Sequence, residues 1–366
     1  MAFQLFHVVG ARPNFMKAAP VLRALAARPG IAQKLVHTGQ HYDLNMSDVF
    51  FRQLGLPAPD YNLEVGSGSH AVQTAQIMMR FEEVVLQDRP DLVLVYGDVN
   101  STVAAALVCA KLQIPVGHVE AGLRSFDRTM PEEINRLLTD QIADLLFTPS
   151  EDANENLRRE GIAPEKIHFV GNVMIDTLVQ LLPQVNGHCR QTLNLAPQKY
   201  ALITLHRPAN VDDRERLSAI WQSLHTISDY LPCVFPVHPR TRSHLVEWGL
   251  SVAAPDRLIL LDPLGYLDFI GLMRDAAVVI TDSGGIQEET TFLGIPCLTL
   301  RENTERPITV EMGTNILVGQ DPVKLEGILK GIKLDKMRSS RIPPLWDGNA
   351  GDRIAQVIVN LIIFNS

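Results

Sequence analysis

The sequence predicts an α/β protein built from two doubly wound, Rossmann-like domains. Short β-branched runs alternate with helical patterns along the chain, which is typical of parallel sheets covered by helices. The length of 366 residues corresponds to two or three domains at about 150 residues each. A stretch from about Gly171 to Lys199 is interrupted by prolines and an Asn-Gly pair, which favours a domain boundary there. We therefore expect one domain at 1–170 and a second at 171–349.

Each predicted strand of the first domain is a short, largely apolar run. The run that ends at Gly97 is apolar almost throughout, as expected for a central strand buried on both faces. The strands are Phe3–Val9, Lys34–His37, Leu92–Tyr96, Val116–Val119, Leu145–Thr148 and Ile167–Val170. The helices between them are Met16–Ala27, His70–Gln87, Ser101–Leu112, Glu132–Ala143 and Asp152–Glu160.

The same alternation restarts in the second half of the chain. Its predicted strands are Ala201–Leu205, Cys233–Val237, Leu258–Leu261, Val278–Thr281 and Pro296–Thr299. The final stretch, 350–366, contains an amphipathic helix that we expect to pack back on the first domain. Two such domains would face each other across a cleft, and ligands bind outside the carboxyl ends of the strands of such sheets.

Composition excludes several classes of protein. Apolar residues make up 46% of the chain and charged residues 20%, so the chain is neither disordered nor fibrous. The net charge of −8 argues against nucleic acid as a partner. The pattern of the N-terminal segment MAFQLFHVV predicts a strand and not a signal peptide. The longest apolar run, 103–110, is too short to span a membrane. The four cysteines lack C-x-x-C spacing, which indicates reduced thiols in a soluble, cytoplasmic protein.

Known cofactor motifs are also missing. The sequence has no G-x-G-x-x-G that opens a helix after a strand, no G-x-x-x-x-G-K-[ST] and no G-x-S-x-G. His37 and His41 are separated by a turn, and the carboxylates considered below lack the His or Cys partners of a zinc site. We expect neither a cofactor nor a metal ion.

Charged residues follow several predicted strands of the first domain. Arg12 and Lys17 lie where a helix begins, which favours an anion site, although two solvated surface cations would look the same. Asp98 could serve only as a helix N-cap, and Glu132 could serve only the helix dipole. Glu120 ends a buried strand, where a carboxylate is costly unless it is paired. Three carboxylates that converge on one sheet edge favour acid–base chemistry.

The second domain offers a phosphate site. After the strand that ends at Thr281 comes Asp-Ser283-Gly284-Gly285, and a helix starts immediately behind it, so that the backbone can approach a phosphate. Glu289 lies about one turn further on, within reach of ribose hydroxyls, and Arg306 follows the next strand as a further cation. His206 follows the first strand of this domain, a place where a histidine can equally serve packing.

Eight short motifs occur in order along the chain and together resemble the non-hydrolysing UDP-N-acetylglucosamine 2-epimerases. The resemblance runs from residue 3 to about residue 319. The motifs are Gly10-Ala-Arg-Pro, His37-Thr-Gly-Gln-His, Tyr96-Gly-Asp, His118-Val-Glu-Ala-Gly-Leu-Arg, Met130-Pro-Glu-Glu-Ile-Asn-Arg, His206-Arg, Asp282-Ser-Gly-Gly-Ile-Gln-Glu-Glu and Thr304-Glu-Arg-Pro.

The resemblance implies a GT-B fold with its active site in the interdomain cleft, a homodimer, and cofactor-independent interconversion of UDP-N-acetylglucosamine and UDP-N-acetylmannosamine. In this family UDP is eliminated anti to give 2-acetamidoglucal and is then added back. The matching catalytic residues are Asp98, Glu120, Glu132 and His206. The matching positions that hold the nucleotide or its phosphates are Arg12, Lys17, Arg136, Ser283, Gly284, Glu289 and Arg306, and we add Gly285 and Phe269 as substrate-binding candidates.

Some segments depart from the pattern of many bacterial members, in which this region binds an activating second substrate molecule. They are Gln40-His-Tyr-Asp43, His206-Arg-Pro-Ala-Asn210 and His238-Pro-Arg-Thr241, and they leave activation by substrate open. Gln40–Asp43 and the Arg124-Ser-Phe-Asp-Arg128 segment are similar to relatives that epimerise UDP-2,3-diacetamido-2,3-dideoxy-glucuronate, so that substrate is an alternative.

Three other functions compete with epimerisation by elimination. A GT-B glycosyltransferase would need an acceptor site, and no basic, aromatic membrane-docking stretch is present in the first domain. A hydrolysing epimerase would release free sugar and UDP. A protein that only binds a nucleotide sugar would gain nothing from three carboxylates near the diphosphate.

Overall fold

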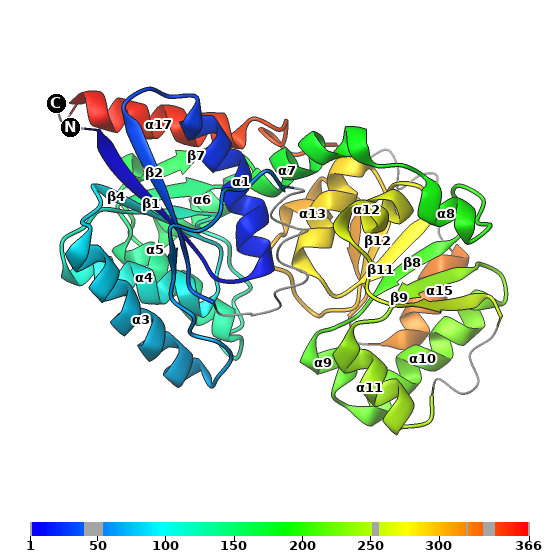
Figure 1. Cartoon of the computed structure of the whole chain (residues 1–366). Coiled ribbons are helices and arrows are strands. Elements are labelled where there is room, and N and C mark those ends of the chain that lie inside the picture. Colours follow the sequence, from blue (N-terminus) through cyan, green and yellow to red (C-terminus); the bar gives the residue numbers. More distant parts are fainter. Residues whose placement is uncertain (1, 40–53, 251–255, 320, 332–340, 365–366) are drawn as a thin grey trace. The chain divides into compact units, whose positions relative to one another are not determined.

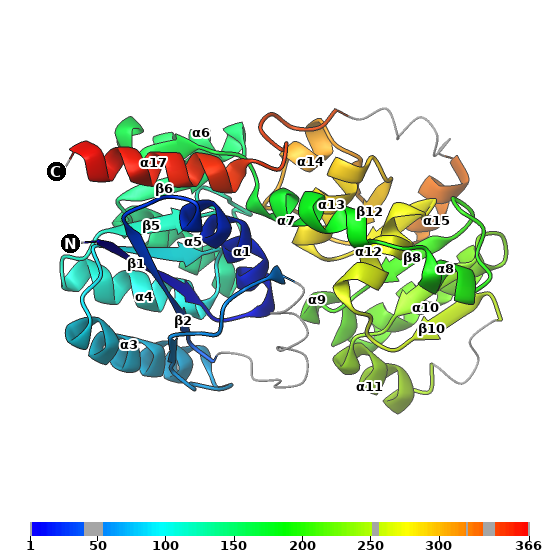
Figure 2. The ribbon, with the colours of Figure 1, turned by 45° about the horizontal axis from the view of Figure 1, so that its top comes forward.

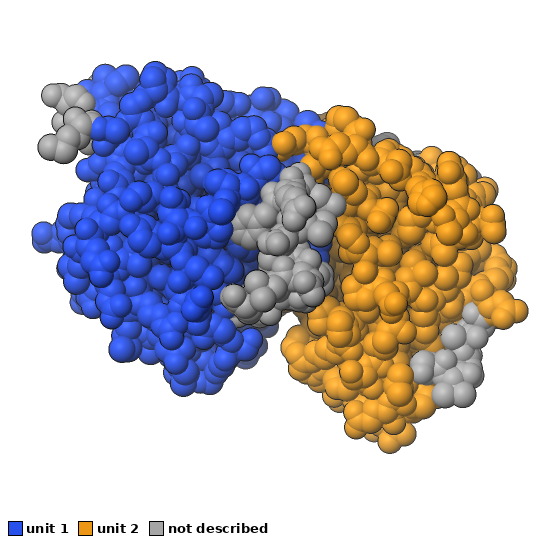
Figure 3. Space-filling model, in the orientation of Figure 1, with its two compact units in different colours: residues 1–179, 344–366 blue, residues 180–343 orange. Residues whose placement is uncertain are grey.

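The computed structural model describes residues 2–39, 54–250, 256–319, 321–331 and 341–364. They form two compact units: unit 1 comprises residues 1–179 and 344–366, and unit 2 comprises residues 180–343 (Figure 3). Each unit is a parallel sheet with helices on both faces (Figures 1 and 2). The predicted class of two Rossmann-like α/β sheets is therefore confirmed. The motif Gln40–Asp43 lies outside the described residues.

The seven-stranded sheet of unit 1 has the order β3-β2-β1-β4-β5-β6-β7 in the described residues, with all neighbours parallel. The central strand β4 is buried at every position, as its apolar sequence predicts. The strands are β1 (Phe3–Val9), β2 (Ile31–His37), β3 (Tyr61–Asn62), β4 (Leu92–Tyr96), β5 (Val116–Val119), β6 (Leu145–Thr148) and β7 (Ile167–Phe169). The helices are α1 (Arg12–Ala26), α3 (His70–Gln87), α4 (Asn100–Lys111), α5 (Pro131–Ile142), α6 (Glu151–Arg159), α7 (Val173–Leu181) and α17 (Ala350–Phe364).

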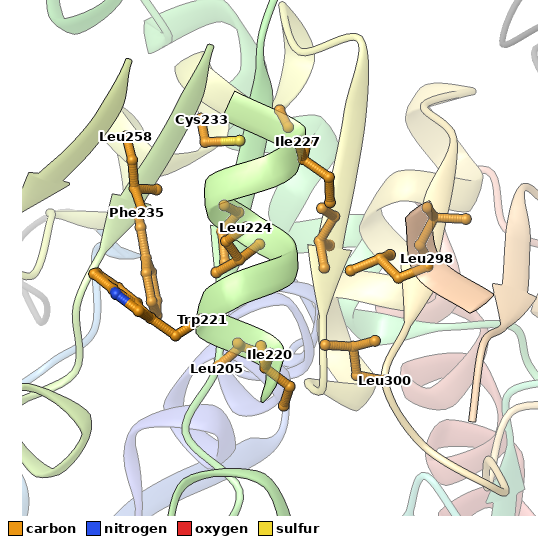
Figure 4. Packing of buried hydrophobic residues seen from close by; sticks show 14 of the residues in the cluster. Leu205, Ile220, Trp221, Leu224, Ile227, Cys233, Phe235, Leu258, Leu298 and Leu300 are labelled. Carbon is orange, nitrogen blue, oxygen red and sulfur yellow. The ribbon is translucent and has the colours of Figure 1, made fainter. Parts of the chain in front are cut away.

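The described part of unit 2 contains a six-stranded parallel sheet of order β10-β9-β8-β11-β12-β13. Trp221 and Leu224 of one covering helix pack with Phe235 of β9 in its buried core (Figure 4). The strands are β8 (Ala201–Thr204), β9 (Cys233–Pro236), β10 (Leu258–Leu261), β11 (Val278–Thr281), β12 (Cys297–Thr299) and β13 (Asn315–Leu317). The helices are α8 (His188–Thr192), α9 (Pro208–Val211), α10 (Arg214–Ser228), α11 (Pro239–Glu247), α12 (Tyr266–Arg274), α13 (Gly284–Leu293), α14 (Ile308–Glu311) and α15 (Pro322–Gly331).

The units divide at Val179, later than the boundary at residue 170 that we expected, and unit 2 ends at Pro343 and not at residue 349. The C-terminal segment accounts for the difference, because it packs on unit 1. Trp346 Nε1 donates to the Pro149 carbonyl at 2.9 Å. The first turn of α17 donates backbone N–H groups to Asp176 of α7. Helix α17 then lies alongside α1 (Figures 1 and 2).

Strand order reverses at one point in each sheet, between β1 and β4 in unit 1 and between β8 and β11 in unit 2. Loops that follow two such strands diverge to opposite faces of the sheet, and ligands bind where they separate. Asp98 follows β4, His206 follows β8 and Ser283 follows β11. Several of the predicted site residues therefore lie at these switch points.

The described helices include none that is long and apolar enough to cross a membrane. Within the same residues, no group of three or more His, Cys, Asp or Glu side chains could hold a metal ion.

His7 is a fully buried titratable residue in the sheet of unit 1. Its Nδ1 lies 2.6 Å from the Tyr96 hydroxyl and its Nε2 lies 2.9 Å from Gln33 Oε1. Burial lowers the pKa of His7 to about 3, whereas the hydrogen bond to Gln33 opposes the shift. The folded protein therefore keeps this ring neutral at pH values at which the unfolded chain protonates it.

We expect this difference in pKa between the folded and unfolded states to lower the free energy of unfolding as the pH drops below about 6.5. The unfolded state binds one more proton there, so between pH 7.5 and pH 5.0 the wild type loses about 2 kcal/mol more unfolding free energy than His7→Gln does. Urea unfolding at the two pH values measures the difference. His70→Gln, at an exposed histidine, serves as the control and keeps the wild-type dependence. Equal losses in wild type and His7→Gln would contradict the prediction.

Candidate functional site

The loop after β1 connects the start of α1 to the end of β4. Asn14 Oδ1 accepts the backbone N–H groups of Gly10 and Ala11 at 3.1 and 2.9 Å. Asn14 Nδ2 donates to the Tyr96 carbonyl at 2.7 Å. The same helix carries Arg12, which is exposed, and it begins at that residue. The sequence singled out the cations of this loop but missed Asn14, which holds the loop in place.

Lys17 and Glu120 form a buried ion pair. A carboxylate at the end of a buried strand needs such a partner, and Lys17 of α1 supplies it. Glu120 has a φ of +75°, which is uncommon for a residue other than glycine and often marks a functional site. Gly97 adjoins the pair, because a Cβ there would lie 2.6 Å from Lys17 Nζ and 3.2 Å from Glu120 Oε2. The ends of β4 and β5 and the start of α1 therefore meet at this point.

Asp98 forms an ion pair with Arg136 of α5. Its side chain is 26% exposed, whereas the guanidinium of Arg136 is buried. Asn135 Nδ2 donates to the Asp98 carbonyl at 2.9 Å, so two consecutive residues of α5 hold the Asp98 turn. Asp98 is thus a fixed carboxylate that solvent or a ligand can still reach.

Glu133 anchors the loop before α5. Its carboxylate accepts the backbone N–H groups of Ser125 and Phe126 and also pairs with Arg136 at 2.7 Å. Burial opposes ionisation of Glu133, but these hydrogen bonds outweigh it and lower its pKa. From sequence alone, the buried structural role of Glu133 could not be distinguished from the role of Glu132 beside it.

Glu132 is exposed in the first turn of α5. It lies four residues before Arg136 and therefore on the same side of the helix. Glu132 is thus an exposed carboxylate near Arg136, whereas the adjacent Glu133 is buried and pairs with Arg136 directly.

A buried hydrogen-bond network supports the turns that carry Asp98 and Glu120. His118 Nδ1 lies 2.6 Å from Asp140 Oδ1, and His118 Nε2 donates to the Gly97 carbonyl at 2.8 Å. Asp140 Oδ2 also accepts from Gly122 N at 3.0 Å and from Arg124 at 2.7 Å. The sequence analysis assigns no role to Asp140. The feature that could have identified it is a charged residue on the buried face of an amphipathic helix.

In unit 2, β11 leads through Ser283 into α13, as predicted. Gly284 and Gly285 form the first turn of this helix, whose free N–H groups and dipole favour an anion. A Cβ at Gly284 would lie 2.5 Å from Arg306 Nη1, so Arg306 lies beside the helix start and a larger residue would displace it.

Arg306 belongs to a buried charge cluster. It contacts Glu305 at 2.5 Å and Glu288 at 2.7 Å, and Arg301 contacts Glu305 at 2.6 Å. Arg207 approaches Glu305 at 3.6 Å. Burial alone would raise the pKa of Glu305, but the surrounding guanidinium groups hold it well below its usual value. Three guanidinium groups thus gather around two carboxylates near the start of α13.

The remaining candidates of unit 2 lie on α12 and α13 and after β8. Glu289 accepts a hydrogen bond from the Tyr266 hydroxyl at 2.7 Å. Phe269, half-buried, follows Tyr266 by three residues and lies on the same side of α12. His206 has a side chain that is 43% exposed, and its Nδ1 lies 3.1 Å from Asp282 Oδ1.

Within each unit the predicted residues gather as follows. In unit 1, direct contacts join Lys17 to Glu120 and Arg136 to Asp98, while Arg12 and Glu132 are exposed on the first turns of α1 and α5. In unit 2, Arg306 lies beside Gly284. His206 contacts Asp282, the residue directly before Ser283. The supporting residues that sequence reasoning missed are Asn14, Glu133, Asn135, Asp140, Tyr266 and Asp282.

Two doubly wound parallel sheets, each with polar residues after its switch-point strands, define the class of the protein as GT-B-like. The chain belongs to the UDP-N-acetylglucosamine 2-epimerase family, whose family model matches residues 23–359.

Relatives of known name are similar over nearly their full length. The UDP-N-acetylglucosamine 2-epimerase of Methanococcus maripaludis is 46% identical over 364 residues, 97% of each chain. The UDP-2,3-diacetamido-2,3-dideoxy-D-glucuronate 2-epimerase of Pseudomonas aeruginosa is 44% identical over 98% of this chain and 100% of its own. The crystal structure of the Methanocaldococcus jannaschii UDP-GlcNAc 2-epimerase in complex with UDP-GlcNAc and UDP matches with a TM-score of 0.90 and 45% identity, covering 98% of this chain and 100% of that one.

Proposed function

We propose that this protein is an isomerase that interconverts UDP-N-acetylglucosamine and UDP-N-acetylmannosamine at the second sugar carbon. The observation that carries the proposal is the arrangement at the carboxyl ends of β4 and β5, where Asp98 and Glu120 are each paired with a cation. The partner of each carboxylate holds it in one position, and a catalytic base must be fixed within reach of the proton that it removes. Family membership and the ligands named for the M. jannaschii structure support the choice of UDP-sugar.

The chemistry that fits these residues is elimination followed by re-addition. A carboxylate of unit 1 removes the proton from the second carbon, the electron pair of that C–H bond forms a double bond to the first carbon, and the bond to the UDP oxygen breaks. UDP then adds back to the first carbon while a proton returns to the opposite face of the second. No hydride leaves the sugar, so this route needs no dinucleotide.

We assign the removal of the proton to a carboxylate of unit 1 and most of the nucleotide contacts to unit 2. Asp98 and Glu120 are the candidate bases, and Glu132 is exposed on the same face of α5 as the partner of Asp98. The start of α13, with its helix dipole and with Arg306 beside Gly284, suits a departing diphosphate. His206, after β8, is a further catalytic candidate. The candidate nucleotide-binding residues are Ser283, Gly284, Gly285, Glu289, Arg306 and Phe269 in unit 2 and the cations Arg12, Lys17 and Arg136 in unit 1.

A second candidate substrate is UDP-2,3-diacetamido-2,3-dideoxy-glucuronate. It is favoured by the P. aeruginosa relative, whose 44% identity nearly equals the 46% of the M. maripaludis relative. The same residues would perform the same elimination, since the change at the second carbon is identical.

One experiment tests both substrates. Each UDP-sugar is incubated with the protein in heavy water without added cofactor, and proton NMR follows the products. We expect UDP-N-acetylmannosamine that carries deuterium at the second carbon. Turnover of the uronate alone would move the proposal to the second substrate, and free sugar would indicate a hydrolysing enzyme. An unchanged spectrum with both sugars would overturn epimerisation and leave transfer or binding.

Gly97 offers a test of the charged arrangement in unit 1. Gly97→Ala introduces a Cβ within 2.6 Å of Lys17 Nζ at a backbone φ of +64°, so we expect it to displace the Lys17–Glu120 pair and to abolish most activity. Gly161→Ala is a matched control, because φ is +81° there and nothing lies within 4 Å of the new Cβ. Both variants carry about 1–2 kcal/mol of backbone strain. Equal activities, measured with the NMR assay, would contradict the prediction.

A further inference from the structure

Asp282 is a fully buried carboxylate between β11 and the start of α13. It precedes Ser283 directly, yet it points back toward β8. Its Oδ2 accepts the backbone N–H of Arg207 at 2.9 Å and the side-chain amide of Asn210 at 3.1 Å. The backbone N–H of His206 lies 3.2 and 3.1 Å from Oδ1 and Oδ2. The segment that follows β8 is thus folded around this one carboxylate.

The His206 ring also contacts this carboxylate. Nδ1 of the ring lies 3.1 Å from Asp282 Oδ1. Burial opposes ionisation of Asp282, but His206, the backbone N–H of Arg207 and Asn210 outweigh it and lower the pKa of the carboxyl. An ionised carboxylate 3.1 Å away repels the lone pair of an unprotonated Nδ1, so it favours the tautomer that carries the proton on Nδ1.

We propose that Asp282 is a positioning residue that holds His206 with Nδ1 protonated and presents Nε2 to the substrate, an inference that rests on the proposed function for the role of His206. A neutral imidazole has one donor and one acceptor nitrogen, and the partner of one nitrogen decides the state of the other. The Asp282 contact therefore leaves the lone pair on Nε2, which can accept a proton. Once Nε2 is protonated, the ion pair with Asp282 stabilises the imidazolium.

Other contacts fix the same geometry. Asn210 donates at once to Asp282 and to the Leu300 carbonyl after β12, at 3.0 Å for the latter. The His238 ring lies 6.2 Å from that of His206, centroid to centroid. The imidazole therefore lies between a buried carboxylate that it contacts directly and a second ring, while 43% of its side chain stays exposed.

Asp282→Asn separates this role from simple support of the backbone. The amide oxygen can remain on the side of Arg207 and Asn210 and keep those two hydrogen bonds. The amide NH₂ then faces Nδ1, which must become the acceptor, so the proton moves to Nε2. The fold is retained while the tautomer is reversed.

The primary readout is the tautomer of His206 by long-range ¹H–¹⁵N NMR on histidine-labelled protein at pH 8, with the signal assigned from His206→Gln. We expect the Nδ1–H form in the wild type and the Nε2–H form in Asp282→Asn. A wild-type ring with the proton on Nε2 overturns the proposal without recourse to any variant. An unchanged tautomer in Asp282→Asn overturns it as well.

Kinetics provide the second readout. Asp282→Asn lowers kcat on the order of 10²-fold or more, and it causes no further loss in the His206→Gln background, because it acts through that ring. The control Asp212→Asn removes a partly exposed carboxylate that lies 3.8 Å from His244, and it keeps wild-type kcat. A further loss in the His206→Gln background contradicts the positioning role. If the wild type shows no epimerisation but the tautomer reverses, the proposed function fails and the positioning of His206 stands.

Discussion

Replacing Asp98 by asparagine lowers kcat for epimerisation by about 10²–10⁴-fold, the usual contribution of a well-placed base. The side chain of Asp98 is 26% exposed, held by Arg136 and by Asn135, so its position is fixed while a ligand can reach it. Asparagine has the same shape but cannot take up a proton. Arg136 keeps its second partner, Glu133, so the fold of the turn is retained.

UDP affinity is expected to stay at the wild-type value in Asp98→Asn, because Asp98 is not among the residues to which we assign the nucleotide and Arg136 keeps its pairing with Glu133. Calorimetric titration with UDP measures it alongside the NMR assay. Asp91→Asn is the matched control: Asp91 precedes the same strand β4 at its opposite end and accepts the backbone N–H of Gln4 at 2.7 Å. If Asp98→Asn retained turnover but lost UDP, Asp98 would be a binding residue and not a base.

Much of the fold followed from local sequence alone. The strands at Phe3–Val9, Leu92–Tyr96 and Val116–Val119 have the predicted bounds, because a buried parallel strand is a short apolar run between polar turns. The strands β3 (Tyr61–Asn62) and β13 (Asn315–Leu317) were not predicted. They are edge strands of only two and three residues, too short to stand out from their surroundings, and pairing to a neighbour defines them more than their own sequence does.

The candidate site was predictable in its members but not in its pairings. Sequence shows that Glu120 ends a buried strand and needs a cation, but it cannot show that Lys17, 103 residues earlier, supplies it. Adjacent glutamates on a helix point about 100° apart, so the orientations of Glu132 and Glu133 depend on how α5 is rotated against its sheet. Asp282 looked like part of the Ser-Gly-Gly turn, whereas its contacts belong to the segment after β8.

Asp140→Ala is expected to lower the free energy of unfolding by about 3–5 kcal/mol, as is typical when one partner of a buried ion pair is removed. Asp140 is fully buried and accepts from His118, Gly122 and Arg124. Alanine removes all three contacts and leaves two of the donors on buried side chains. Arg124 retains Glu160, at 2.7 Å, so the loss should stay within that range.

The control is Asp144→Ala, which removes an exposed carboxylate that accepts the backbone N–H of Val116 at 3.0 Å, at the opposite end of the same strand β5. It should cost about 1 kcal/mol, the net value of an ordinary hydrogen bond. Urea unfolding measures both variants. Because the His118–Asp140 pair also supports the Gly97 carbonyl and Gly122, the Asp140 variant should lose activity at temperatures at which it is still folded, whereas the Asp144 variant should not. Equal destabilisation by the two substitutions would mean that the buried network contributes no more than a surface contact, and the rigidity that we ascribe to the Asp98 and Glu120 turns would then need another source.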